Sequence, residues 1–241
     1  MKSIPGLILV FLIISLTSCG SGSQGKSDDG TQIQRKYNQM GKLEAEISHI
    51  DGIKHGPARY YYDNGKLQYL IHYENGKKHG ESTWYYEDGK VYQVTPFVNG
   101  EEHGIKKKYY PSGNLMSEAK YINGEQQPGL EEYTETGKLI TGYPEIVFEK
   151  PVKESTGNRF TLKMHMSNNT KEVAFKQLVI SKDGDTITAP VPTRDGIGEI
   201  PFFVNKGGST SAVIHISAVT KTKLNNRYVT SSDYKVNIHN R

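Results

Sequence analysis

The sequence contains one cysteine, one tryptophan and no apolar segment long enough to cross a membrane as a helix. A single cysteine excludes an internal disulfide framework. The 30 basic and 26 acidic side chains leave a formal net charge of only +4, which is too small to indicate a nucleic-acid partner. The longest apolar stretch, residues 4–16, is shorter than the about 20 residues that a membrane-spanning helix needs.

The first residues are typical of an export signal. Lys2 supplies a positive charge, and the apolar stretch that follows has the length of a signal-peptide core. The motif Leu16-Thr17-Ser18-Cys19 resembles a bacterial lipobox. This resemblance implies that residues 1–18 are a signal peptide and that Cys19 carries diacylglycerol. Because a lone thiol in an exported protein is otherwise open to oxidation, lipidation is favoured over an incidental cysteine or a simple anchor helix.

Residues 19–36 are predicted to be the lipidated cysteine and a flexible tether. Residues 20–30 have no apolar side chain and are rich in glycine and serine, the composition of a flexible linker. Gly20 differs from the aspartate of an inner-membrane retention signal. We therefore expect a protein held at the outer membrane through Cys19, with several acyl chains giving stable anchoring. The sequence leaves open whether it faces the periplasm or the exterior.

Internal repetition dominates the next hundred residues. Glycines and tyrosines recur every 24 residues in several series that keep one phase, and an aliphatic residue follows two positions after each member of the first glycine series. Such fixed periodicity is the signature of a repeat architecture. The main series are Gly41, Gly65, Gly89, Gly113 and Gly137; Gly52, Gly76, Gly100 and Gly124; and Tyr61, Tyr85, Tyr109 and Tyr133.

Each period is predicted to form two β-strands joined by tight turns. Asn-Gly and Asp-Gly pairs are preferred in two-residue hairpins, because both central residues need positive φ. Between the turns, side chains alternate in the manner of a half-buried strand. The sequence therefore predicts an antiparallel meander over residues 37–142. The glycines expected at structural turns are Gly52, Gly76, Gly100 and Gly124.

These repeats resemble a known family. The pattern Tyr-Tyr-x-x-Gly-Lys-Leu followed by Tyr-x-Asn-Gly-x-x-x-Gly is similar to the bacterial variant of the MORN repeat, and residues 65–80 are the clearest copy. The resemblance covers about residues 37–140, as four copies and a partial one. Members of this variant include YwqK-type proteins described as antitoxin-like. The resemblance implies recognition of a partner and supplies no catalytic residues.

A second unit is predicted over residues 143–241. The repeat stops near Tyr143, and only Tyr228 and Tyr234 lie beyond it. Seven short strand-like runs then suggest an immunoglobulin-like β-sandwich, with a sheet that extends the repeat stack as the alternative. The whole folded part is therefore expected to be all-β. The runs are residues 145–148, 160–166, 173–180, 185–191, 200–204, 211–219 and 228–238.

Candidate metal sites are weak in this sequence. His55, His79 and His103 recur in register, but two strands per period separate equivalent residues by about 10 Å, too far to share one ion. Asp183-x-Asp185 lacks the further ligands of a calcium loop and is better interpreted as a hairpin turn. We therefore expect no metal and no cofactor. The lysines of residues 106–108 are predicted to lie on a solvated strand face.

The tyrosine pairs are the strongest candidate for binding. They place aromatic rings on both faces of successive hairpins, and tyrosine buries a large area at low entropic cost. One row would pack the sheet, and the other would contact a protein or glycan. The alternative is that both rows only stabilise the sheet through cross-strand pairs. The candidate binding residues are Tyr61, Tyr85, Tyr109, Tyr133 and Trp84.

Together these features predict a non-enzymatic, lipid-anchored recognition or scaffold protein of the cell envelope. Its partner would be a protein or a glycan bound by the repeat sheet. Two alternatives remain: an immunity protein that neutralises a delivered toxin, and a cell-wall or glycan hydrolase of unrecognised type. A toxin gene beside this one would favour the first, and an open pocket with paired carboxylates would favour the second.

Overall fold

A computed structural model describes residues 24–26, 30–155, 157–180 and 186–241. The signal peptide, Cys19 and the Asp183-x-Asp185 turn lie outside the described residues. Every regular element within these ranges is a β-strand, and the predicted all-β fold is confirmed. Among the described residues, no helix is long and apolar enough to cross a membrane.

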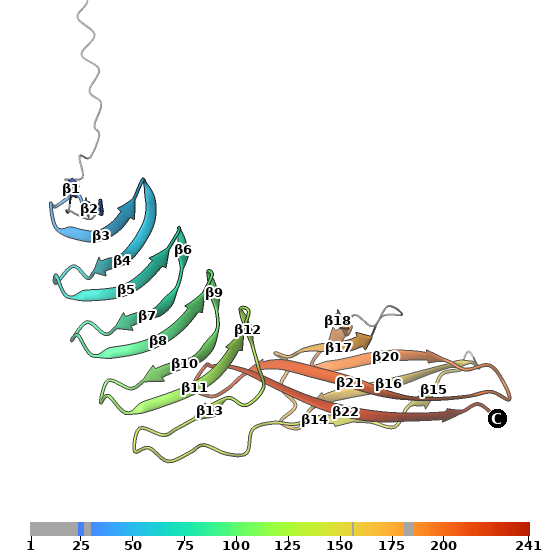
Figure 1. Ribbon diagram of the computed structural model, residues 1–241. Coiled ribbons are helices and arrows are strands. Elements are labelled where there is room, and N and C mark those ends of the chain that lie inside the picture. The colour runs from blue at the N-terminus through green and yellow to red at the C-terminus, as the bar shows by residue number, and fades with distance from the viewer. Residues whose placement is uncertain (1–23, 27–29, 156, 181–185) are drawn as a thin grey trace, which may run out of the picture.

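In the described residues, the N-terminal part is one antiparallel sheet of 13 strands, arranged as a stack of hairpins (Figure 1). The main strands follow one another in chain order, as the meander prediction requires, and short strands extend three of the hairpins. The strands are β1 (Gln24–Lys26), β2 (Gln32–Tyr37), β3 (Leu43–Ile50), β4 (Ile53–Tyr61), β5 (Leu67–Glu74), β6 (Lys77–Lys78), β7 (Gly80–Tyr85), β8 (Val91–Val98), β9 (Glu101–Glu102), β10 (Gly104–Tyr109), β11 (Leu115–Ile122), β12 (Glu125–Gln126) and β13 (Glu131–Glu132).

One set of turns has positive φ at two successive residues. Asn75 has a φ of 48° and Gly76 a φ of 81°, and the other three pairs of this set, at residues 51–52, 99–100 and 123–124, share this conformation. Positive φ at both central residues matches the right-handed twist of the flanking strands. The Gly76 amide also donates to the Lys54 carbonyl of the preceding repeat at 2.8 Å. The turn therefore shapes its own hairpin and bonds it to its neighbour.

The repeat sheet begins before the predicted boundary at residue 37. Strand β1 pairs with β2, and β2 pairs with β3 from Gln32 to Tyr37, so the predicted tether is wrong for residues 24–26 and 32–36. Residues 32–36 are not rich in glycine and serine as residues 20–30 are. In this segment the half-buried Ile33 and Arg35 flank the exposed Gln34. The Arg35 side chain contacts Glu46 of β3 at 2.9 Å. Strand pairing therefore starts at least five residues earlier than the repeat motif.

The C-terminal part is a sandwich of two antiparallel sheets (Figure 1). One sheet has the order β14-β16-β20-β19, with β15 paired to β16, and the other has the order β18-β17-β21-β22. In the described chain neither sheet pairs with the repeat sheet, so the alternative of an extended repeat sheet is wrong. The strands are β14 (Ile146–Phe148), β15 (Val152–Lys153), β16 (Arg159–Met166), β17 (Ala174–Ile180), β18 (Thr186–Pro190), β19 (Thr193–Arg194), β20 (Ile197–Phe203), β21 (Ser209–Lys221) and β22 (Arg227–His239).

The strand order follows the immunoglobulin arrangement, in which the first, second and fifth main strands form one sheet. The fourth main strand, β18, pairs with β17 rather than with β20. Apolar side chains from both sheets meet in a single core, because alternate residues of each strand point inward. Phe175, Leu162, Met164, Met166 and Ile216 are at most 1% exposed in this core.

A long hairpin connects the sandwich to the repeats. Strands β21 and β22 are each 13 residues long, and their tip reaches the last repeats (Figure 1). There Lys108 Nζ donates to Asn226 Oδ1 at 2.7 Å, and Gln126 Nε2 donates to the Arg227 carbonyl at 2.8 Å. These bonds join the two parts of the molecule at one end of the repeat sheet.

Candidate functional site

Two rows of directly opposed residues run across the repeat sheet and define its faces. We call the face that meets the β21–β22 tip the inner face. The outer row consists of Arg35, Glu46, Arg59, Leu70, Thr83, Val94, Lys107, Glu118 and Glu131. The inner row consists of Lys36, Ala45, Tyr60, Tyr69, Trp84, Gln93, Lys108, Ser117 and Glu132. Both rows cross every repeat.

Burial differs sharply between these faces. Ala45, Ile47 and Ala58 are at most 3% exposed and pack with Tyr60 and Tyr73 on the inner side. By contrast, no member of the outer row falls in the fully buried class in the part of the chain described. The fully buried positions of the two rows therefore all lie on the inner face, whereas the middle of both rows is half-buried.

Aromatic rings on the inner face stack on one another. Tyr69 and Trp84 lie 5.2 Å apart between ring centroids, and Tyr92 meets Trp84 edge-on at 4.6 Å. Tyr92 also meets Tyr86 at 5.1 Å. Such pairs contribute about 0.5–1.5 kcal/mol beyond their buried area. Trp84, one of the predicted binding residues, is thus engaged in packing between repeats.

The second tyrosine of each Tyr-Tyr pair joins successive repeats. Its hydroxyl donates to the backbone carbonyl of the first tyrosine in the next repeat. These bonds are Tyr62 to Tyr85 at 2.6 Å, Tyr86 to Tyr109 at 2.7 Å and Tyr110 to Tyr133 at 2.7 Å. The sequence prediction missed this role, although the recurrence of these tyrosines at 24 residues was a usable signal.

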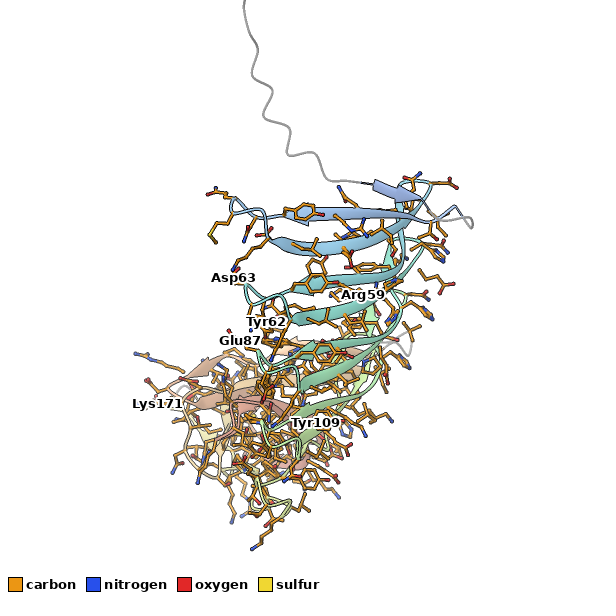
Figure 2. The ribbon with its side chains drawn as sticks, turned by 90° about the vertical axis from the view of Figure 1, so that its left-hand side faces the viewer. Arg59, Tyr62, Asp63, Glu87, Tyr109 and Lys171 are labelled. Carbon is orange, nitrogen blue, oxygen red and sulfur yellow. The ribbon has the colours of Figure 1, made fainter. Side chains whose placement is uncertain are left out.

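Turn lysines make a second bond of the same kind. Lys42 Nζ donates to the Asp63 carbonyl at 3.0 Å, and Lys66 Nζ donates to the Asp88 carbonyl at 3.0 Å. Figure 2 shows the loops that carry Asp63 and Glu87 as successive steps along one edge of the sheet. Each lysine therefore ties its own turn to the turn one step further along that edge.

The first tyrosines point toward the outer row. Tyr61 donates its hydroxyl to Glu46 Oε2 at 2.8 Å, and Tyr133 donates to Glu131 Oε2 at 2.7 Å. Tyr85 and Tyr109 occupy the same bulged register position as Tyr61. Burial and then the Glu46 carboxylate raise the pKa of Tyr61. The four predicted binding tyrosines therefore share one face, separate from Trp84.

Charge along the outer row changes from end to end. Arg35, Glu46 and Arg59 alternate in sign at one end, with an Arg35–Glu46 ion pair at 2.9 Å. The middle of the row, Leu70, Thr83 and Val94, is uncharged. Lys107 pairs with Glu118 at 2.8 Å near the other end. A half-buried apolar centre between charged ends is the composition of a protein-binding surface.

The predicted histidine series does not converge. His79 Nδ1 lies 3.4 Å from Glu74 Oε2, and His103 Nδ1 lies 3.3 Å from Asn123 Oδ1. Within the described ranges no three His, Cys, Asp or Glu side chains are grouped as metal ligands. Each of these two histidines instead contacts a polar side chain at the turn beside it.

A buried carboxylate lies where the repeat sheet meets the sandwich. Glu132, 1% exposed, accepts hydrogen bonds from Thr222 Oγ1 at 2.6 Å, Asn226 Nδ2 at 2.6 Å and the Tyr143 hydroxyl at 3.1 Å. Burial and the Glu132 charge raise the pKa of Tyr143 strongly. Because Asn226 also accepts from Lys108, it links a cation to a buried anion.

Lys108 corrects the prediction that residues 106–108 all lie on a solvated face. It belongs to the inner row and is half-buried, and burial is the main cause that lowers its pKa. Lys107, its neighbour in sequence, lies on the outer face. Successive side chains of β10 point to opposite faces of the sheet, which separates Lys107 from Lys108. The sequence did not reveal this difference, because all three positions are lysine.

Comparison with known families identifies the repeats. Residues 54–75, 78–99 and 102–123 match the family model of the MORN repeat variant. Repeats of this kind are generally associated with binding, including interactions with membranes and proteins. No curated protein matches the chain. The three matched segments extend from β4 to β11, so the outer and inner rows both cross them.

Proposed function

We propose that this chain is a lipid-anchored protein of the bacterial cell envelope that binds a partner protein through the outer face of its repeat sheet. Binding rather than catalysis is the proposed activity. A YwqK-type immunity protein would be a narrower case, in which the partner is a toxin. The proposal combines the lipobox of the sequence with one feature of the repeat sheet.

That feature is the outer row with its adjoining tyrosines. The inner face is occupied by stacked rings and by the β21–β22 tip, and the outer row lies on the opposite face, where its members are half-buried or exposed. Its uncharged centre, Leu70, Thr83 and Val94, lies between charged ends. Tyr85 lies in the same strand as Thr83. Apolar centres with polar rims and added tyrosines are favoured where proteins dock.

The anchor rests on the sequence alone. Cys19 follows the pattern of a lipobox, and Gln32 begins the first strand that extends the repeat stack. Cys19→Ser should abolish incorporation of labelled palmitate and release the protein from pelleted membranes. Continued labelling of this variant would contradict the anchor, and Ser23→Thr, outside the lipobox, is the control that should be labelled as wild type.

Partner binding is tested by a charge placed at the centre of the outer row. Thr83→Arg should reduce capture of cross-linked envelope proteins about tenfold or more, because an unpaired charge at an interface centre is costly. Lys77→Glu, in an exposed turn, is the matched control and should leave capture unchanged. Both variants should keep the wild-type melting temperature. Equal capture by wild type and Thr83→Arg would overturn the proposed surface.

A further inference from the structure

A cavity of about 210 Å³ lies between the inner face and the hairpin tip of the sandwich. Its lining comes from β8, β10, β11 and β12 on one side and from Asn226 and Arg227 on the other. An engineered cavity of about 150 Å³ accepts benzene. This cavity is therefore large enough for a single six-membered ring with a small substituent.

The lining is cationic. Lys106, Lys108 and Arg227 all contribute, and no carboxylate is among the lining residues. Glu102 contacts Lys106 at 2.9 Å, and Glu132 reaches Lys108 through Asn226. Three cations against these two carboxylates leave one positive charge at the site. That balance suits a ligand with a single negative charge.

Lys108 and Arg227 have donors to spare. The Lys108 ammonium has three N–H groups, and its one side-chain acceptor in the described chain is Asn226 Oδ1. Arg227 is exposed, its backbone pairs with Lys221 and accepts from Gln126, and its guanidinium donates to no side chain in that same part of the protein. Burial lowers the Lys108 pKa, so an anion beside it would offset a desolvation cost. Both residues therefore line the cavity and carry N–H groups that a carboxylate can accept from.

The rest of the lining fits a hydroxylated ring. Ser117 contributes a hydroxyl and Gln93 an amide oxygen, and the amides of Gln126 and Asn226, which already bond Arg227 and Glu132, each keep one further N–H for ring hydroxyls. A smaller apolar part is formed by Ala119, Tyr121 and Leu130. Polar groups of both hydrogen-bonding types around a small apolar wall favour a sugar over a bare inorganic anion, whose charge needs only donors.

We infer that this cavity binds one hexuronic acid ring, with its carboxylate held by Lys108 and Arg227 and its hydroxyls held by the neighbouring amides. The ring is either a free sugar acid or one residue of an acidic polysaccharide. This site is on the opposite face from the proposed protein-binding surface, and neither depends on the other.

Calorimetric titration of the full chain with glucuronate, glucose and inorganic phosphate tests the inference. Glucuronate should bind at least about tenfold more tightly than glucose or phosphate, and the binding should weaken as salt increases. A polyuronate oligomer is the second arm. Tighter binding of the oligomer assigns the site to a polysaccharide residue, and its failure to bind assigns the site to the free acid.

Three variants locate the binding. Lys108→Gln retains a donor for Asn226 and should lose about tenfold or more in glucuronate affinity, as should Arg227→Gln. Lys107→Gln removes the neighbouring cation on the outer face and should bind as wild type. Phosphate binding as tight as glucuronate, wild-type affinity in either cavity variant, or an equal loss in Lys107→Gln would overturn the inference. Partner capture by Lys108→Gln is expected to be unchanged.

Discussion

The repeat sheet and the sandwich are both antiparallel β-structures, yet different contacts hold them together. The sandwich buries 14 side chains in one apolar core, and residues far apart in sequence meet there. The repeat sheet has a small apolar cluster of three buried residues. It relies instead on bonds from each repeat to the next, made by Tyr62, Lys66 and Gly76 and their equivalents. The sandwich is therefore stabilised by one core that all its strands share, whereas the stability of the repeat sheet is close to a sum of contacts between neighbouring repeats.

A core truncation should produce the largest effect and should affect the sandwich alone. Leu162 is 0% exposed, so Leu162→Ala should cost about 2–5 kcal/mol. Amide exchange should then accelerate throughout the sandwich strands, since they share one core, while β4 and β5 keep their protection. Equal acceleration in both parts would show that the molecule unfolds as one unit and would remove the contrast.

A turn substitution should have an intermediate and local effect. Gly76 has a φ of 81°, and a Cβ there would lie 3.4 Å from Ile53 Cγ2. Gly76→Val should destabilise the protein by about 1–3 kcal/mol, because a β-branched residue is strained at positive φ. Gly76→Asn is the matched control and should cost much less, since asparagine tolerates this region. Chemical denaturation measures both, and similar losses would argue against backbone strain as the cause.

Removal of one between-repeat hydroxyl should have a smaller effect. Tyr62→Phe deletes the bond to the Tyr85 carbonyl and the hydroxyl that accepts from Trp84 Nε1, and it should cost about 1 kcal/mol or slightly more. Tyr37→Phe provides the comparison, because Tyr37 is 47% exposed and has no such bond in the described chain. If both changes have the same effect on the denaturation midpoint, the hydroxyl does not couple the repeats.

The smallest predicted effect depends on pH. The Tyr61 hydrogen bond, followed by Arg35, holds the pKa of Glu46 below its ordinary value of 4.5. The folded state therefore favours the carboxylate, and this contribution is present above about pH 4.5 and is lost as pH falls through the lowered pKa. Glu46→Gln should cost up to about 1 kcal/mol at pH 7 and less at pH 3. Urea midpoints that differ equally at both pH values would contradict this assignment.

The repeats were predictable from sequence to the extent that their contacts are local. Asn75-Gly76 and its equivalents indicate their own turns, and the 24-residue period fixes the order of the strands. The first two strands were missed because β1 and β2 pair without carrying the motif. The inter-repeat role of Tyr62 was also missed, since its partner is a backbone carbonyl that leaves no mark on the sequence.

The junction was beyond sequence reasoning for a different reason. Glu132 and Asn226 are 94 residues apart, and Lys108 and Asn226 are 118 apart. No repeat period or motif links the members of either pair, because Lys108 and Glu132 lie in the repeat sheet and Asn226 lies in the sandwich. Only the placement of the β21–β22 tip against the inner face brings them together.

The stacking of repeats between the N-terminal end and the sandwich also determines how far the sandwich is held from the proposed anchor (Figure 1). Each repeat adds two strands, and strands are spaced by 4.7–4.9 Å. Duplication of one internal copy would therefore lengthen the stack by about 10 Å. Because the sandwich is bonded to the last repeats, through Lys108, Gln126 and Glu132, its attachment would be unchanged. The number of repeats thus sets the length of the stack in fixed steps, and under the proposed anchoring it would set the distance between the membrane and the sandwich.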